Sequence, residues 1–251
     1  MAKQSHRLAG ALAAAGLALV SGACARCSPP VAPAPPPAHL AAVPDGFGEP
    51  YSERRVLRVR ERALVLVDGR ACGDPAGDAA CAEALVALRG EPLAVEIDAA
   101  LLMADLSAPL AALARALEPG QQACLVVRDS KSVRCLPFRP MSGEEFGAWL
   151  DAPKPFGKIR IVMRSDGIEV VADRGKVPGP DRFGPSLPSK LGKPDFEGLE
   201  PIARALGHNF DDEEAVVVPS AGTTFAAAAR ALGALSGPGA ERFPRTFLVY
   251  P

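Results

Sequence analysis

The stretch AVVVPSAGTTFAAAARALGALSGPG, residues 215–239, predicts a short apolar strand, a turn and a helix that is closed by Gly237, Pro238 and Gly239. The segment LAVEIDAALLMADLSAPLAALARALEPG, residues 93–120, follows nearly the same pattern 122 positions earlier. Self-similarity at a fixed offset indicates an internal repeat. We therefore expect the chain to contain two copies of one sheet-and-helix unit.

The first copy, residues 55–140, is predicted to form a hairpin, a helix, a strand, a second helix and a strand. Its strands are marked by period-2 alternation or by short apolar runs, and its helices by leucine at helical spacing. Ser107 is the expected N-cap of the second helix. Residues 141–157 are expected to form a connecting helix, because Ser142 and Glu145 match a capping box.

The second copy, residues 158–251, begins with another predicted hairpin, in which Asp166 and Gly167 supply the left-handed turn. A helix and the opening stretch follow, and a final apolar strand closes the sheet. The acidic residues 211–214 precede the strand of the opening stretch, and we interpret them as a solvated lead-in. The expected fold class is α/β (α+β), built as two tandem small β-β-α-β-α-β domains.

The two copies diverge at residues 173–195, a stretch of glycine, proline and scattered charge without periodicity. Long irregular loops inside compact domains are uncommon and are often functional. We therefore predict a partner-contacting segment here, with Arg182, Phe183 and Lys190 as candidate contacts. A mobile insertion without a role is the alternative.

The helix of the opening stretch is apolar on most of its surface. Phe225 begins a core stripe, whereas Ala226, Ala227 and Ala231 make the opposite side almost equally apolar, with Arg230 as its charged residue. A helix of this kind usually has both faces covered, so we expect it to pack on the other copy or on a second chain. Phe225 and Arg230 are therefore candidate partner contacts, and a homodimer is one expected arrangement.

The charge balance does not indicate nucleic acid as a partner, and none is expected. The chain of 251 residues has 28 basic and 29 acidic side chains, a net charge of −1, so it lacks the basic excess of a nucleic-acid-binding protein. Hydrophobic residues make up 48% of the chain and aromatic residues only 5%, so the core must be built mainly from Ala, Val and Leu.

The six cysteines fall into three close pairs, which is typical of proteins in an oxidising compartment. Cys124 and Cys135 flank a predicted hairpin and are expected to face each other as a disulfide. Cys72 and Cys81 bracket a short loop, whose closure by a second disulfide would contribute roughly 2 to 3 kcal/mol. Buried free thiols are the alternative for all four cysteines.

The amino terminus has the layout of a secretory signal, with Lys3 and Arg7 ahead of an uncharged apolar run. The strongly apolar part of this run, residues 8–20, is too short to cross a membrane as a helix. Small residues lead to Cys24, which resembles the lipid-attachment site of bacterial lipoproteins, although Ser21 stands where leucine is usual. We expect residues 1–23 to be removed and Cys24 to carry a lipid; ordinary cleavage and an uncleaved membrane anchor are the alternatives.

Residues 24–54 are predicted to be a lipid-anchored linker, because residues 28–44 contain seven prolines in 17 positions. At about 3.1 Å per residue, such an extended segment could reach roughly 50 Å and hold the folded part away from a membrane. Cys24 and Cys27 also spell a C-x-x-C pattern, but no metal site is expected without a second such pair.

The run VVVPSAGTTFAAAARALGALSGPG resembles the periplasmic domain of the ExbD/TolR family, the small subunits of proton-driven bacterial envelope motors. In that family a strand ends in Asp, an aromatic residue follows five positions later, and Gly closes the helix. Phe225 and Gly239 match, whereas Ser220 replaces the Asp. The first copy keeps the acid as Asp98 but has Met103 at the aromatic position.

The resemblance implies a protein on the periplasmic side of the envelope that binds a protein partner or the cell wall. The family's proton-carrying Asp lies in a transmembrane helix, but residues 8–25 contain no acidic residue. We therefore expect a non-catalytic accessory or scaffold lipoprotein of an envelope transport system. The alternatives are a membrane-anchored motor subunit and an enzyme of unknown type, which clustering of Glu96, Asp98 and His208 in a pocket would favour.

Motifs of common enzymes are absent from the sequence. There is neither a P-loop nor a G-x-S-x-G element, and no catalytic residue, metal or cofactor is expected. His208 stands at a predicted helix end, where histidine commonly contacts free carbonyl groups. Ser220, Thr223 and Thr224 precede a helix and are interpreted as capping residues, with anion binding as the alternative.

Overall fold

The structure, a computed structural model, describes residues 39–52, 54–60, 62–72, 78–152, 158–172, 174–207, 214–237 and 243–251. Residues 37–251 form one compact unit. The predicted signal peptide, Cys24, Cys27, His208 and Gly239 lie outside the described residues. No helix within the described ranges is long and apolar enough to span a membrane.

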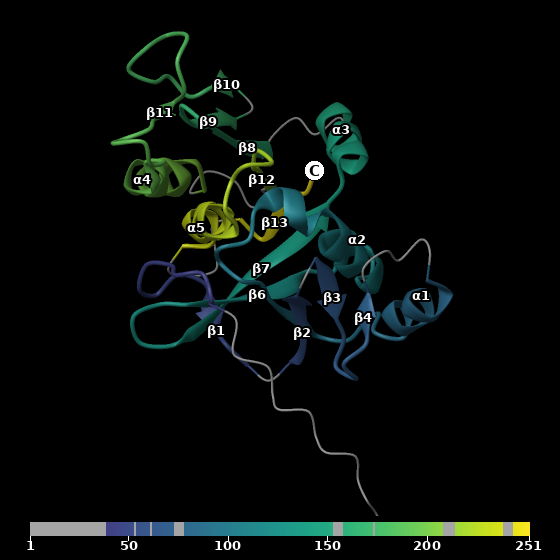
Figure 1. Ribbon diagram of the computed structural model, residues 1–251. Coiled ribbons are helices and arrows are strands. Elements are labelled where there is room, and N and C mark those ends of the chain that lie inside the picture. Colours follow the sequence, from purple (N-terminus) through teal and green to yellow (C-terminus); the bar gives the residue numbers. More distant parts are fainter. Residues whose placement is uncertain are drawn as a thin grey trace, which may run out of the picture. The chain divides into compact units, whose positions relative to one another are not determined.

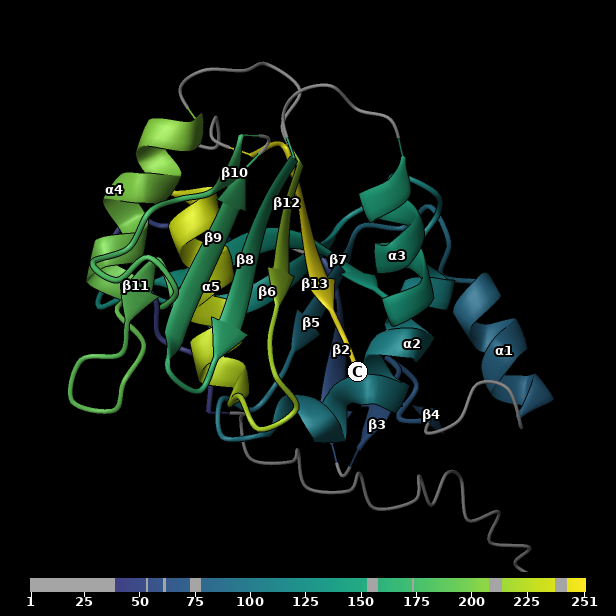
Figure 2. The ribbon, with the colours of Figure 1, turned by 90° about the horizontal axis from the view of Figure 1, so that it is seen from above.

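One mixed sheet runs through the compact unit and contains 13 strands among the described residues (Figure 1, Figure 2). Its main path follows the order β10-β9-β8-β12-β13-β7-β6-β5-β2-β3-β4, while β1 pairs with β7 and β11 pairs with β9. The strands are β1 Glu49–Pro50, β2 Arg55–Arg60, β3 Ala63–Val65, β4 Ala71–Cys72, β5 Leu93–Glu96, β6 Ala123–Arg128, β7 Val133–Met141, β8 Lys158–Arg164, β9 Gly167–Ala172, β10 Gly175–Lys176, β11 Leu187–Pro188, β12 Glu214–Val218 and β13 Arg245–Val249. The helices are α1 Ala79–Val86, the 3-10 turn η1 Met103–Leu106, α2 Ser107–Ala116, α3 Gly143–Asp151, α4 Phe196–Gly207 and α5 Phe225–Ser236.

Each half of the chain has the order of elements that the sequence predicts, and the α/β class is confirmed. In the first half, the hairpin β2–β3 is followed by β5 and β6, and these strands lie in the order β3-β2-β5-β6. In the second half, β8, β9, β12 and β13 lie in the equivalent order β9-β8-β12-β13. Strand β7 is antiparallel to β6 and parallel to β13, so the two halves share one sheet.

The segments that follow β5 and β12, residues 99–104 and 221–226, run into η1 and α5 and lie against each other in what we call the inter-repeat contact. Two pairs of backbone hydrogen bonds join them: Met103 N to Thr223 O (2.9 Å) with Phe225 N to Leu101 O (2.7 Å), and Ala104 N to Ala221 O (3.1 Å) with Ala226 N to Ala99 O (3.0 Å). The repeat offset of 122 residues relates Met103 to Phe225 and Leu101 to Thr223. Adding the offset to one bond of each pair gives the other bond with donor and acceptor exchanged between the two segments, so the two segments meet with local two-fold symmetry.

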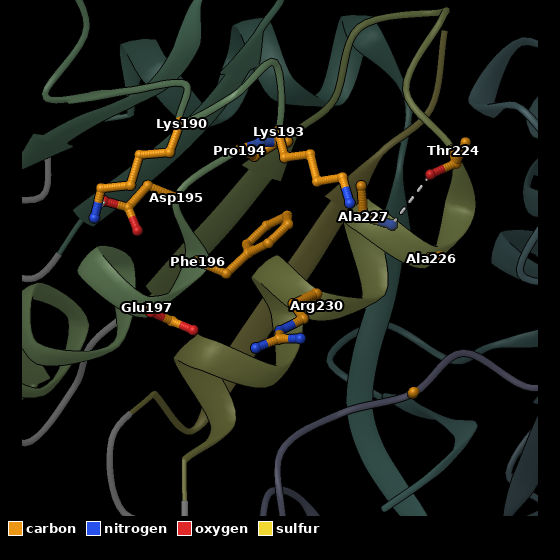
Figure 3. Close-up of a pocket in the computed structure, with 11 residues that line it drawn as sticks. Lys190, Lys193, Pro194, Asp195, Phe196, Glu197, Thr224, Ala226, Ala227 and Arg230 are labelled. Carbon is orange, nitrogen blue, oxygen red and sulfur yellow. Dashed lines mark hydrogen bonds and ion pairs between the residues drawn. The ribbon is translucent and has the colours of Figure 1, made fainter.

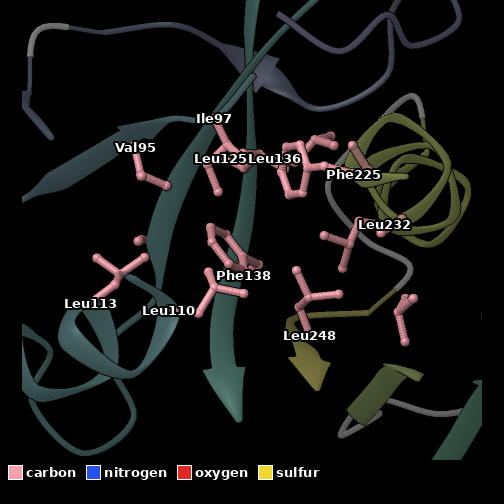
Figure 4. Packing of buried hydrophobic residues seen from close by; sticks show 14 of the residues in the cluster. Val95, Ile97, Leu110, Leu113, Leu125, Leu136, Phe138, Phe225, Leu232 and Leu248 are labelled. Atoms are coloured by element: carbon pink, nitrogen blue, oxygen red, sulfur yellow. The ribbon is translucent and has the colours of Figure 1, made fainter. Parts of the chain in front are cut away.

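The main hydrophobic core lies on one face of the sheet and spans both halves. Alternate strand residues, such as Val95, Leu125 and Leu248, point into it, as the pleat of a strand requires. Figure 4 shows Leu110 and Leu113 of α2 reaching these strands from one side, with α5 on the other side. Helix α2, which connects the parallel strands β5 and β6, and helix α5, which connects β12 and β13, thus cover one shared core.

Helix α5 is covered on both sides, as its sequence predicts. Phe225 on one side and Ala231 on the other are both fully buried. A Cβ atom at Gly233 would lie 3.3 Å from Val43 and 3.9 Å from Leu136 of β7. The segment around Val43 and strand β7 of the first half therefore cover this side of α5 near Gly233, whereas Ala226 and Ala227 in its first turn stay partly exposed.

Helix α3 packs against the opposite face of the sheet. Phe146 and Trp149 contact a smaller apolar cluster there, formed by Met141, Val216 and Val249. The helix begins with the predicted capping box, in which the side chains of the N-cap serine and the third-residue glutamate each accept a backbone hydrogen bond. The predicted connecting helix is thus present and docked on the sheet.

Glu214 corrects the interpretation of residues 211–214 as a solvated lead-in. Its side chain is only 7% exposed, accepts a hydrogen bond from Trp149 Nε1 at 2.8 Å and pairs with Arg245 at 3.1 Å. Residues 211–213 lie outside the described residues. Glu214 therefore ties α3 to two central strands, and a buried carboxylate of this kind requires such partners.

Residues 174–195, the described part of the segment expected to be irregular, fold back onto the second half. Strands β10 and β11 both pair with β9. The buried Ser186 hydroxyl donates to Val177 O at 2.7 Å and accepts a hydrogen bond from Val170 N at 3.1 Å. The prediction of a segment without secondary structure is wrong, because strands of two residues leave no periodicity to detect.

Part of the expected linker belongs to the folded unit. Ala41, Val43 and Phe47 are buried, and Val43 N donates to Arg128 O at 2.9 Å. Strand β1 pairs with β7 and extends the sheet beside it. The chain is therefore fixed to the sheet from residue 41, well before residue 54.

Ser107 does not cap α2, contrary to the prediction. The turn η1 runs directly into the helix, so the position before α2 is already helical and no side-chain cap is formed. The Ser107 hydroxyl instead donates to Pro251 O at 2.6 Å. This bond fastens the last residue of the chain to the start of α2.

Both predicted disulfides are present in the structure. The bond between Cys72 and Cys81 joins β4 to α1, and the bond between Cys124 and Cys135 joins β6 to β7. The latter two residues lie diagonally across the ladder, since Cys124 is opposite Pro137. All four cysteines are fully or almost fully buried.

Candidate functional site

An open groove of about 530 Å³ lies between the turn before α4 and the first turns of α4 and α5 (Figure 3). Its volume falls in the usual range of ligand sites, roughly 300 to 1,000 Å³. The residues that line it combine charged side chains with small apolar ones. They are Ala42, Lys190, Lys193, Pro194, Asp195, Phe196, Glu197, Thr224, Ala226, Ala227 and Arg230.

A tight turn at residues 190–193 carries both lysines of the groove. Lys190 N donates to Lys193 O at 2.8 Å, and Lys193 N donates to Lys190 O at 3.0 Å. Leu191 and Gly192 at its tip have φ angles of +51° and +75°. Two successive left-handed residues are typical of a type I′ turn, which here brings the two lysines to neighbouring positions.

Asp195 fixes the start of α4. Its Oδ1 accepts a hydrogen bond from Gly198 N at 3.0 Å, and its Oδ2 lies 2.7 Å from Lys190 Nζ. The hydrogen bond from Lys190 lowers the pKa of the Asp195 carboxyl, and the same bond raises the pKa of the Lys190 ammonium. The two charges therefore compensate each other at the rim of the groove.

Thr224 fixes the start of α5, because its hydroxyl accepts a hydrogen bond from Ala227 N at 3.4 Å. The hydroxyl groups of Ser220 and Thr223 lie 2.9 Å apart and bond to each other. Two further amides at this helix start are occupied by the inter-repeat contact. The structure therefore confirms the capping role for Thr224, whereas the Ser220 and Thr223 hydroxyls bond to each other and do not cap the helix.

Arg230 and Lys193 form no ion pair within the described part of the chain. The Arg230 guanidinium carbon lies 5.7 Å from the centre of the Phe196 ring, and its Nε is buried without a hydrogen-bond partner. Figure 3 shows Arg230 beside this ring and Lys193 extending into the groove. The groove thus holds two uncompensated cations and one exposed carboxylate, Glu197.

The groove brings together two of the five predicted partner contacts, Lys190 and Arg230. Arg182 and Phe183 lie elsewhere on the same segment, where Phe183 is 87% exposed and the Arg182 guanidinium lies 5.7 Å from its ring centre. Phe225 is fully buried in the core. Its prediction as a partner contact is wrong, because no part of its side chain reaches the surface.

Sequence reasoning did not find Lys193, Asp195 or Phe196. The available signal was the Leu191-Gly192 pair within a charged stretch, since glycine often marks a tight turn. Nothing in the sequence places this turn beside α5, which begins more than thirty residues later.

The residues whose clustering would favour an enzyme do not meet in the groove. Asp98 accepts a hydrogen bond from Ala100 N at 2.9 Å within its own turn, and Glu96 lies 2.7 Å from Arg58 Nε. His208 lies outside the described residues. Within the described ranges, no three or more His, Cys, Asp or Glu side chains are grouped so that they could hold a metal ion.

A second open cavity, of about 520 Å³, lies at the tip of the β6–β7 hairpin beside residues 39 and 40. Its acidic residue, Asp129, accepts hydrogen bonds from Lys131 N at 2.8 Å and Ser132 N at 2.6 Å. This carboxylate thus serves the hairpin turn, so we regard the groove as the stronger candidate.

No protein-family model, curated protein or solved structure matches the chain. The resemblance to the ExbD/TolR family therefore depends on the quoted residues and on the order of elements.

Proposed function

We propose that this chain is a non-catalytic lipoprotein of the bacterial cell envelope, in which two ExbD/TolR-like units form one body that binds an envelope partner. A lipid on Cys24 would hold the chain at the periplasmic side of a membrane. The proline-rich segment after it would act as a spacer. The role would be that of an accessory or scaffold in an envelope transport system.

The observation that carries this proposal is the inter-repeat contact. Its bonds exchange donor and acceptor under the 122-residue offset, which is the geometry of an isologous dimer interface. Two copies of a small unit that have been fused into one chain would keep such an interface. This supports the tandem interpretation of the repeat, on which the resemblance to the ExbD/TolR family rests.

Two further observations support an exported protein with a binding role. The disulfides Cys72–Cys81 and Cys124–Cys135 are of a kind that persists in oxidising compartments such as the periplasm. The groove presents Lys193 and Arg230 without anionic partners among the described residues, and uncompensated charge next to apolar surface is typical of a binding site.

The proposal is tested by cross-linking in intact cells followed by capture of the full chain in gentle detergent. Sedimentation with purified peptidoglycan is measured in parallel. We expect one of the two to recover a specific envelope component, and recovery of neither would refute the proposal. A membrane-bound chain that still begins at Met1 would instead favour the motor-subunit alternative.

A further inference from the structure

We infer that the groove and the turn at residues 190–193 form a docking surface for an acidic segment of a protein partner that also carries an apolar side chain. The inference rests on the proposed function and names the chemistry of the partner. Three independent observations support it: the unpaired cations, an exposed leucine on a strained backbone, and the shape and lining of the groove.

The charges of the groove favour an anionic ligand. Lys190 and Asp195 compensate each other, whereas Lys193 and Arg230 have no ion-pair partner among the described residues. Glu197 also lines the groove, so its side chains carry three positive and two negative charges, a net charge of +1. The buried Arg230 Nε has no hydrogen-bond acceptor, and leaving such a donor unsatisfied costs free energy. The buried Nε itself is out of reach of a ligand, but a carboxylate in the groove would meet the positive charges of Arg230 and Lys193.

Leu191 indicates a protein contact next to these cations. Its side chain is fully exposed, with a relative accessibility of 101%, and its φ angle of +51° is one that non-glycine residues rarely adopt. In the described residues only Arg62 shares a positive φ without being glycine. An apolar side chain held in water on a strained backbone is unfavourable in the free protein, and a partner that covers it would remove part of this cost.

The lining of the groove favours a peptide over a glycan. Pro194, Ala226 and Ala227 are small and leave room for a backbone and short side chains. The aromatic ring that a sugar could stack on, Phe196, is already in contact with the Arg230 guanidinium. In an acidic segment with an apolar residue, the carboxylates would meet the cations of the groove and the apolar side chain would cover Leu191.

The test uses the full mature chain in detergent and a fluorescein-labelled peptide of alternating glutamate and leucine. A peptide with glutamine in place of glutamate serves as its neutral match. We expect the acidic peptide to bind in fluorescence anisotropy and the neutral one to bind far more weakly. Lys193→Glu and Arg230→Gln each remove a positive charge from the groove and should each weaken binding by about tenfold, which corresponds to about 1.4 kcal/mol.

Arg204→Glu is the matched control, because Arg204 is an exposed arginine on α4 that does not line the groove. It should leave peptide affinity unchanged. Leu191→Gly should weaken binding without lowering the thermal midpoint, because glycine adopts the left-handed conformation without strain. This combination separates loss of contact from loss of folding, which thermal melts of every variant also monitor.

Absence of acidic-peptide binding, or equal binding by the wild type, Lys193→Glu and Arg230→Gln, would overturn the inference. The inference would also be overturned if the wild type sediments with peptidoglycan, the Lys193→Glu variant does not, and neither protein binds the acidic peptide. In that case the proposed envelope function would stand with a different ligand. Failure of both cell-wall sedimentation and cross-linking in cells would instead remove the proposed function itself.

Discussion

Leu102 and Thr224 face each other in a single antiparallel bridge, and the residues are separated by 122 positions, the offset of the internal repeat. The bonds from Met103 to Thr223 and from Phe225 to Leu101 enclose this pair. It is therefore a non-hydrogen-bonded pair, in which the Cα atoms of facing residues lie about 4.5 Å apart. One position of the repeat thus contacts its own equivalent across a local two-fold axis.

A cysteine pair tests this relationship. Leu102→Cys combined with Thr224→Cys should form a disulfide under mild oxidation, because a Cα separation of about 4.5 Å lies within the range that disulfides span. Proteolysis and mass spectrometry would identify the linked peptides. Each single variant should keep a free thiol, and two free thiols in the double variant would show that the two loops do not face each other.

Glu214 is expected to be a stability determinant. Glu214→Ala removes an acceptor from Trp149 Nε1 and a counter-charge from Arg245, so unfolding free energy should fall by about 2 to 3 kcal/mol. Trp149→Phe should cost about 1 kcal/mol or more, since it removes one bond and part of the ring. Urea denaturation measures both; the exposed Glu83→Ala on α1 should stay within about 0.5 kcal/mol of the wild type.

The hydrogen bonds to Asp129 in the β6–β7 turn should make the folded protein less stable in acid. The Lys131 amide and other donors hold the pKa of Asp129 below its usual value of 3.8. The unfolded chain therefore takes up the proton first as the pH falls, so the contribution of Asp129 is present above about pH 4 and is lost below it. Asp129→Asn should be less stable than the wild type near neutral pH and should lose less stability on acidification.

Urea midpoints measured at about pH 7 and about pH 3 give this comparison. Asp151→Asn, at the exposed end of α3, should keep the pH dependence of the wild type and serves as the control. Parallel pH curves for the wild type and Asp129→Asn would show that Asp129 does not contribute in this way.

The two disulfides should each stabilise the folded unit. They close short loops, with sequence separations of 9 and 11 residues, for which the chain-entropy model gives about 2 to 3 kcal/mol each. Replacing Cys72 and Cys81, or Cys124 and Cys135, by alanine should lower the unfolding free energy by about that amount. A reductant should destabilise the wild type and have no effect on a variant that lacks all four cysteines.

Much of the fold could be predicted from the sequence because its elements are locally encoded. The apolar runs of β5 and β12 and the capping box at Ser142 each carry a local signal, and these elements lie where the signals place them. The hairpin β8–β9 is also present, but the prediction that Asp166 and Gly167 form its left-handed turn is wrong: Gly167 already faces Arg164 in the ladder, and Asp166 has no positive φ. The repeat offset also predicted which segments are equivalent. The offset does not predict that these segments form hydrogen bonds with each other, because backbone hydrogen bonds between distant segments do not appear in the periodicity of side chains.

The errors and omissions arise from contacts between distant parts of the chain. Glu214 was interpreted as solvated because Trp149, its partner, stands 65 positions away. Ser107 was expected to cap α2, but the 3-10 turn η1 runs directly into the helix, so no side-chain cap forms there. Lys193, Asp195 and Phe196 of the groove were not predicted, because no sequence pattern places the turn at residues 190–193 against α5.

The central claim, a lipid-anchored envelope protein, is tested most directly at Cys24. Cells that express the full chain are labelled with a clickable fatty acid, and the amino-terminal peptide of the purified protein is identified by mass spectrometry. We predict a chain that begins at Cys24, carries the label there and lacks residues 1–23. An unlabelled chain that begins at Met1, or at any residue other than Cys24, would contradict the claim.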